Sequence, residues 1–167
     1  MTLGRGLFLR TNDEPSTTNH KPSTINHPPT MARILAIDYG GKRTGLAVTD
    51  PLQIIATGLE TIHSKDLIPY LQKYFASEQV ELIIIGLPVN WDESDTHGTP
   101  LVKAAIKSLQ KHFPAIPIKT VDERYTSKMA KDAMLQMGMK KKDRQVKGNV
   151  DVIAANIILQ EYLQSNQ

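Results

Sequence analysis

The chain has 167 residues, of which 22% are charged, and a formal net charge of +3. This length suits one domain, or one domain with a tail. The absence of cysteine excludes a disulfide framework and a thiolate zinc site. No apolar run approaches the roughly 18 residues of a membrane-spanning helix, so we expect a soluble, cytoplasmic protein without membrane contact. The charge excess is too small to indicate a nucleic-acid partner by itself. Clustering of basic residues is the better indicator of nucleic-acid binding.

The first 30 residues differ in composition from the rest of the chain. They are rich in Thr, Ser, Asn and Pro and contain a near-repeat, STTNHKP followed by STINHPP. Such a segment has too few large apolar side chains to offset the entropy lost on ordering. The sequence therefore predicts a disordered extension over 1–30 and a single folded domain over 31–167.

The predicted elements of the folded domain alternate between strands and helices. Apolar runs and alternation predict five strands, at 33–39, 44–49, 54–61, 81–87 and 116–121. Apolar residues at helical spacing predict four helices, at 64–77, 101–113, 126–137 and 149–163. A polar loop over 88–98 and a basic loop over 138–148 lie between them. Three strands in a meander followed by alternating helices and strands predict an α/β fold, a mixed five-stranded sheet with helices on both faces, in the ribonuclease H-like arrangement.

Acidic residues stand at three ends of these elements. Asp38 ends the first strand, Asp122 and Glu123 end the fifth, and Asp151 opens the last helix. In a sheet of this order the three positions can converge. Carboxylate oxygens from different elements suit Mg²⁺ or Mn²⁺, and two such ions can catalyse phosphodiester cleavage.

Each acid also has a purely structural explanation. Asp38 can form the turn that follows it, and Asp122 can pair with Arg124 or cap the next helix. Asp151, in the first turn of its helix, is favoured there by the helix dipole. Because neighbouring side chains on a strand point to opposite faces, only one of Asp122 and Glu123 is expected to face Asp38.

Basic residues cluster near these acids, as expected for a protein that binds a phosphate backbone. The candidate substrate-binding residues are Lys42, Arg43, Arg124, Lys140, Lys141, Lys142, Arg144 and Lys147. The run KKKDRQVK can also be a solvated loop, as charge runs usually are. Its position directly before Asp151 favours phosphate binding.

Four motifs together resemble the YqgF/RuvX family, relatives of the RuvC Holliday junction resolvases in the ribonuclease H-like superfamily. They are DYGGKRTGLAVTD, IIIGLPVNWDES, VDERYTS and KGNVDVIAANIIL, in this order, and the similarity covers residues 31 to about 163. The resemblance implies a cytoplasmic hydrolase of phosphodiester bonds that processes the 5′ end of pre-16S ribosomal RNA with Mg²⁺ or Mn²⁺. It places the catalytic acids at Asp38, at the Asp122–Glu123 pair and at Asp151.

This sequence departs from RuvC at the fourth strand, which ends in Gly86, Leu87 and Pro88 without an acid. The second acid has moved to the fifth strand. We favour Glu123 there, and expect Asp38, Glu123 and Asp151 to bind the metal. The departure also weighs against resolution of DNA junctions.

Three other functions stay open from the sequence. The first is a DNA junction resolvase, which should be a two-fold homodimer, whereas an RNA nuclease can be a monomer or a homodimer. The second is an actin-like ATP-binding domain, which is disfavoured because such proteins need two domains to enclose the nucleotide. The third is a non-catalytic nucleic-acid-binding factor. The expected partners are therefore structured RNA, such as pre-rRNA, or branched DNA.

Overall fold

The computed structural model describes residues 32–90, 94–122, 129, 140, 142 and 147–166. The predicted extension over 1–30 lies outside the described residues, as does all of the predicted helix 126–137 except Met129. The elements are β1 (Arg33–Tyr39), β2 (Arg43–Thr49), β3 (Ala56–His63), the 3₁₀ turn η1 (Ser64–Asp66), α1 (Leu67–Ser77), β4 (Val80–Leu87), α2 (Thr99–His112), β5 (Ile118–Asp122) and α5 (Lys147–Ser165). Within this part of the chain, no helix is both long and apolar enough to cross a membrane.

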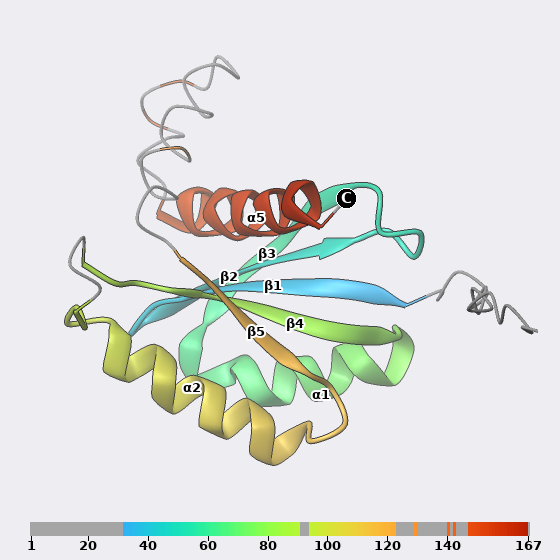
Figure 1. Cartoon of the computed structure of the whole chain (residues 1–167), viewed down its shortest axis with the longest axis horizontal. Coiled ribbons are helices and arrows are strands. Elements are labelled where there is room, and N and C mark those ends of the chain that lie inside the picture. The colour runs from blue at the N-terminus through green and yellow to red at the C-terminus, as the bar shows by residue number, and fades with distance from the viewer. Residues whose placement is uncertain are drawn as a thin grey trace, which may run out of the picture.

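The five strands form one mixed sheet in the order β3-β2-β1-β4-β5. The first three strands pair antiparallel, and β4 and β5 extend the sheet in parallel with β1. Helices α1 and α2 lie against one face, and α5 crosses the other (Figure 1). The architecture confirms the predicted ribonuclease H-like arrangement.

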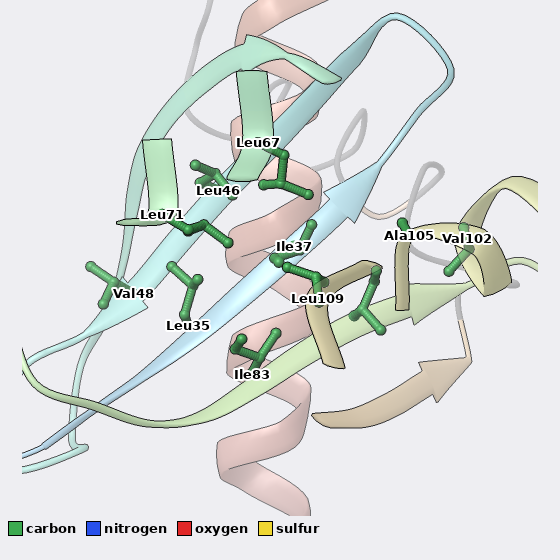
Figure 2. Packing of buried hydrophobic residues seen from close by; sticks show 11 residues of the cluster. Leu35, Ile37, Leu46, Val48, Leu67, Leu71, Ile83, Val102, Ala105 and Leu109 are labelled. Carbon is green, nitrogen blue, oxygen red and sulfur yellow. The ribbon is translucent and has the colours of Figure 1, made fainter. Parts of the chain in front are cut away.

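The alternation of side chains along the strands produces two separate cores. Leu35 and Ile37 of β1 pack with residues of α1 and α2 (Figure 2). Ile34 and Ala36, which alternate with Leu35 and Ile37 along β1, pack against α5 on the other face of the sheet. The central strand is thus covered on both sides, which explains its continuous apolar run.

The third strand begins at Ala56, two residues later than predicted, because Asp50 folds the preceding residues into a turn. Its carboxylate accepts hydrogen bonds from the backbone amides of Leu52, Ile54 and Ile55, at 3.1, 2.7 and 2.7 Å. These hydrogen bonds lower the pKa of Asp50, and the bond from the Ile55 amide contributes most. The amides of Ile54 and Ile55 are therefore used by a side chain rather than by a neighbouring strand.

The last helix also begins two residues before its predicted start, at Lys147. Its first turn lies on β3, an edge strand of the sheet, where the Thr61 hydroxyl donates a 2.7 Å hydrogen bond to the carbonyl of Gly148. This contact between residues distant in the sequence holds the first turn of α5 against β3. Lys147, predicted in the basic loop, is therefore part of α5.

Candidate active site

Asp38 lies on the α5 face of the sheet, near the carboxyl end of β1. Ala36 belongs to the core under α5 and Ile37 to the core on the opposite face, so the alternation directs Asp38 toward α5. Its pairing partner on the adjacent strand β2 is Gly45. On the other side, Ile37 pairs with Ile85 of β4, and the next β4 residue is Gly86. A glycine therefore lies beside Asp38 on each of the two neighbouring strands.

Gly45 brings the last helix next to Asp38. A methyl group built on Gly45 would lie 2.0 Å from the carbonyl oxygen of Asp151, so the helix backbone rests directly on the strand. Cross-strand partners have their Cα atoms only about 5 Å apart. The residue that Gly45 touches, Asp151, is therefore a close neighbour of its strand partner, Asp38. The structure brings these two predicted site residues together.

The position of Asp151 within α5 differs from the prediction. Because the helix starts at Lys147, Asp151 is its fifth residue and lies beyond the first turn, which contains no acid. The attraction of the helix dipole for an acid falls off within the first turn. The dipole alone is thus a weaker explanation for this carboxylate than the sequence suggested.

A cation already lies on Asp151. The Arg43 Nε donates a 2.7 Å hydrogen bond to Asp151 Oδ2, forming an ion pair between β2 and α5. The Asp151 side chain is 19% exposed and that of Arg43 is 41% exposed. Arg43, predicted to bind substrate, is therefore held at a candidate metal ligand.

The turn after Asp38 is fixed by two buried hydroxyl groups. Ser64 donates a 2.6 Å hydrogen bond to the carbonyl of Gly40 and accepts a 3.0 Å bond from the hydroxyl of Thr44. The backbone amide of Ser64 also donates to the carbonyl of Lys42. These bonds hold Lys42, a predicted phosphate-binding residue, on a turn of defined shape.

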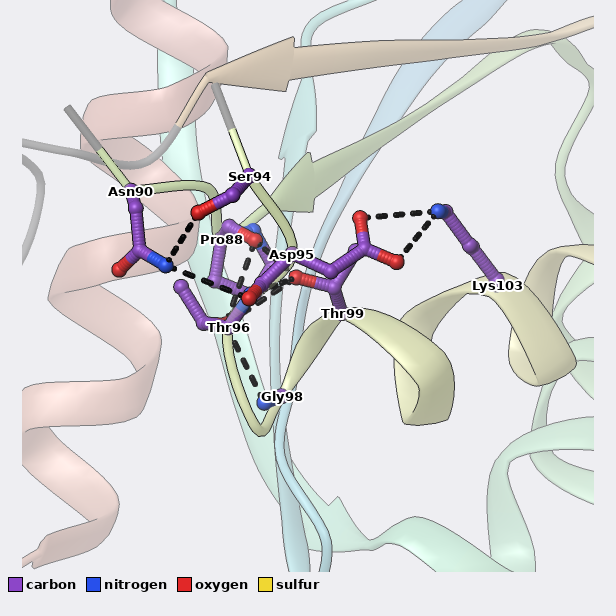
Figure 3. A network of polar contacts seen from close by, with 8 residues as sticks. All are labelled: Pro88, Asn90, Ser94, Asp95, Thr96, Gly98, Thr99 and Lys103. Atoms are coloured by element: carbon purple, nitrogen blue, oxygen red, sulfur yellow. Dashed lines mark hydrogen bonds and ion pairs between the residues drawn. The ribbon is translucent and has the colours of Figure 1, made fainter. Parts of the chain in front are cut away.

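The loop between β4 and α2 borders the same end of the sheet and is organised by two threonines (Figure 3). Thr99 is fully buried, donates to the carbonyl of Pro88 and accepts a 2.8 Å hydrogen bond from the Thr96 amide. The Thr96 hydroxyl accepts from the Gly98 amide at 3.2 Å and also lies 3.3 Å from the Pro88 carbonyl. Side chains thus fix the segment that was predicted as a polar loop.

Replacing Thr99 by Val should destabilise the domain by about 2 kcal/mol, because the isosteric methyl group leaves buried polar groups without this partner. Thr99→Ser, which keeps the hydroxyl, is the matched control and should lose clearly less. Urea unfolding of the three proteins measures the difference. Equal stability of the Val variant and the wild type would show that the hydroxyl does not organise this loop.

Asp122 lies apart from the pair formed by Asp38 and Asp151. Asp122 ends β5, the edge strand of the sheet, next to the last turns of α5. Asp122 lines a cavity of about 450 Å³ with residues near the end of α5. Burial and the charge of Asp122 raise the pKa of Glu161 there. Glu161 follows Asp151 by ten residues, about 15 Å along a helix.

The remaining predicted site residues are only partly described. Lys140 and Lys142 are exposed, as phosphate-binding residues should be. The predicted residues that lie outside the described part are Glu123, Arg124, Lys141 and Arg144. The preference for Glu123 over Asp122 stays a prediction. Among the described residues, no group of three or more His, Cys, Asp or Glu side chains is placed to hold a metal ion.

Sequence reasoning missed Gly45, Thr44 and Ser64. A glycine inside a strand often marks the close approach of another backbone, so Gly45 carried a usable signal. The two hydroxyl residues carried none, because their role depends on a contact between β2 and η1.

The family comparison decides what kind of protein carries this site. The family model RuvX, described as "Holliday junction resolvase", matches residues 32–165. The chain belongs to the RuvX family. This is a family of nucleases, that is, of hydrolases that cleave phosphodiester bonds. The resemblance stated from the four motifs is confirmed.

Curated relatives share about half of their residues with this RuvX protein. A protein from Bacteroides thetaiotaomicron is 50% identical over 137 residues, which are 82% of this chain and 99% of the relative. One from Christiangramia forsetii is 48% identical over 133 residues, 80% of this chain and 98% of the relative. Each is named "Putative pre-16S rRNA nuclease".

A solved structure with a similar chain path is RuvC from Thermus thermophilus in complex with a Holliday junction substrate. Its TM-score is 0.49 at 14% sequence identity, and the match covers 81% of this chain and 95% of that one.

Proposed function

We propose that this RuvX protein is a metal-dependent endonuclease that processes the 5′ end of pre-16S ribosomal RNA in the cytoplasm. The observation that carries the proposal is that the backbone of Asp151 packs on Gly45, the strand partner of Asp38, so that acidic residues from two distant segments are neighbours near the end of β1. The names of the relatives from Bacteroides thetaiotaomicron and Christiangramia forsetii support the choice of RNA.

The donor set fits a hard divalent cation. Carboxylate oxygens are the ligands that Mg²⁺ and Mn²⁺ prefer, and Mg²⁺ commonly takes one or two of them together with substrate phosphates and water. The Asp151 carboxylate already accepts a cationic partner, the Arg43 guanidinium, which supports its suitability for positive charge. Asp38 and Asp151 would hold the ion, with Glu123 as the third ligand.

The residues around this pair suit a phosphodiester substrate. A divalent ion, when bound, supplies an activated water and neutralises charge on the leaving oxygen. Lys42, exposed on the turn after Asp38, would bind a phosphate close to the carboxylates. Lys140 and Lys142 would bind the flanking backbone, with an affinity that falls as salt rises. Asp122, which lines a cavity with Glu161 near the far end of α5, is the weaker candidate for a catalytic role.

A DNA junction resolvase is the second candidate, favoured by the description of the matching family model. A four-way junction has two-fold symmetry, so a resolvase should be a two-fold dimer that cuts two strands. Sedimentation of the protein with and without a junction measures this property. A protein that stays monomeric on the junction would contradict the second candidate, whereas a dimer is compatible with both.

The test of the proposed function compares two substrates under three metal conditions. A pre-16S RNA 5′ leader and a DNA four-way junction are each incubated with Mg²⁺, with Mn²⁺ or with EDTA. We expect the leader to be cut with either metal, to stay intact in EDTA, and the junction to stay uncut. Cleavage of the junction alone would replace the proposal by the resolvase, and binding without cleavage under every condition would identify a non-catalytic factor.

A further inference from the structure

The ion pair between Arg43 and Asp151 connects two parts of the proposed site. Arg43 begins β2, directly after the turn that carries Lys42, and Asp151 lies in α5. The 2.7 Å contact runs from Nε of the guanidinium to Oδ2 of the carboxylate. It is partly shielded from water, since the Asp151 side chain is only 19% exposed. Such a pair is weakened less by solvent than a fully exposed one.

This contact places a positive charge where the proposed function needs a divalent cation. A guanidinium and a divalent ion on one carboxylate repel each other, and the repulsion is strong where water is partly excluded. The guanidinium also occupies one of the lone-pair sites on Oδ2 that a metal ion could use. Two arrangements are therefore conceivable: the arginine stays and orients the carboxylate, or it leaves when the metal arrives.

We propose that Arg43 is an internal counter-ion, which holds Asp151 while no metal is bound and is displaced from it by the divalent cation. This inference rests on the proposed metal-dependent function. The exposure of the Arg43 side chain, 41%, favours displacement, because its guanidinium can turn toward solvent without opening the core. Arginine also keeps its charge at any pH that the protein tolerates. Arg43 thus acts on the metal through Asp151 and is a positioning residue.

The two arrangements predict opposite effects of removing the charge. If Arg43 competes with the metal, Arg43→Gln should bind Mn²⁺ more tightly, by about tenfold, because a partly shielded positive charge is removed from the carboxylate. Arg43→Lys keeps the charge and should stay close to the wild type. If Arg43 instead orients Asp151, the Gln variant should bind Mn²⁺ more weakly.

The experiment measures Mn²⁺ affinity of the full chain from the electron paramagnetic resonance signal of free Mn²⁺, without any substrate. The wild type is compared with R43Q, R43K and D151N, the last of which should lose most of the affinity. Tighter binding by R43Q alone supports the inference, and equal or weaker binding overturns it. If the wild type binds no Mn²⁺, the proposed metal site is wrong and the inference is wrong with it, an outcome distinct from binding that R43Q does not improve.

Thermal unfolding gives a second readout, which is linked to the affinity through the added stability of the metal-bound protein. The ion pair is expected only in the metal-free protein, so R43Q should lower the melting temperature in EDTA and have a smaller effect in saturating Mn²⁺. An equal decrease under both conditions would show that Arg43 stays on Asp151 when the metal is bound, and would overturn the inference.

Discussion

Asp38→Asn should lower the cleavage rate of the pre-16S RNA leader about a thousandfold while the domain stays folded. Metal-assisted charge stabilisation contributes several kcal/mol, and each 1.4 kcal/mol corresponds to about a factor of ten in rate. Asparagine has nearly the same shape as aspartate but no negative charge for a divalent ion. The measurement is the single-turnover cleavage rate in Mg²⁺, with circular dichroism to confirm the fold.

The matched control for this variant is Asp66→Asn. Asp66 is exposed and makes no side-chain hydrogen bond to the start of α1, so the same loss of charge there should leave the rate within about twofold. Full cleavage by Asp38→Asn would remove this carboxylate from the active site. It would return Asp38 to the role of a turn-forming residue.

The second large effect is expected at Gly45, where a single methyl group should destabilise the domain by about 3 kcal/mol. An added Cβ would lie 2.0 Å from the Asp151 carbonyl oxygen and 2.3 Å from its carbon, and backbone atoms cannot turn away as a side chain can. The first turns of α5 would have to move off β2. Such a loss corresponds to a decrease of about 10 °C in the melting temperature of a domain of this size.

Gly41→Ala is the control for this substitution. A Cβ at Gly41 would meet only the Leu101 Cδ1 at 3.7 Å, an ordinary contact, so its stability should change little. Urea unfolding compares the two variants, and Mn²⁺ affinity shows whether moving α5 also separates Asp151 from Asp38. Equal stability of Gly45→Ala and the wild type would contradict the close packing on which the candidate site depends.

Much of the fold follows from short-range patterns in the sequence. The run ELIIIGL predicts a strand covered on both faces, and β4 is such a strand, between the cores under α1 and α2 and under α5. Asp38 at the end of an apolar strand was recognisable as a carboxylate that needs a cationic partner. The family was also evident, because its four motifs are continuous stretches of sequence.

Local patterns did not determine where some elements begin. The third strand starts late because the Asp50 carboxylate takes the amides of Ile54 and Ile55. The last helix starts early, with Gly148 bonded to Thr61 of β3. In the first case a side chain takes backbone amides that a strand would otherwise use, and in the second a side chain supports the first turn of a helix. A prediction from strand and helix propensities alone includes neither effect.

The sequence by itself determined the residue types of the candidate site, the family of the protein and the order of strands and helices along the chain. Only the tertiary structure decided which acids are neighbours and what lies between them. Asp38 and Asp151 are neighbours because Gly45 lets α5 rest on β2, and Arg43 pairs with Asp151, which is 108 residues away in the sequence. Such contacts depend on how a helix is placed on a sheet. The spacing of residues along a single segment does not determine that placement.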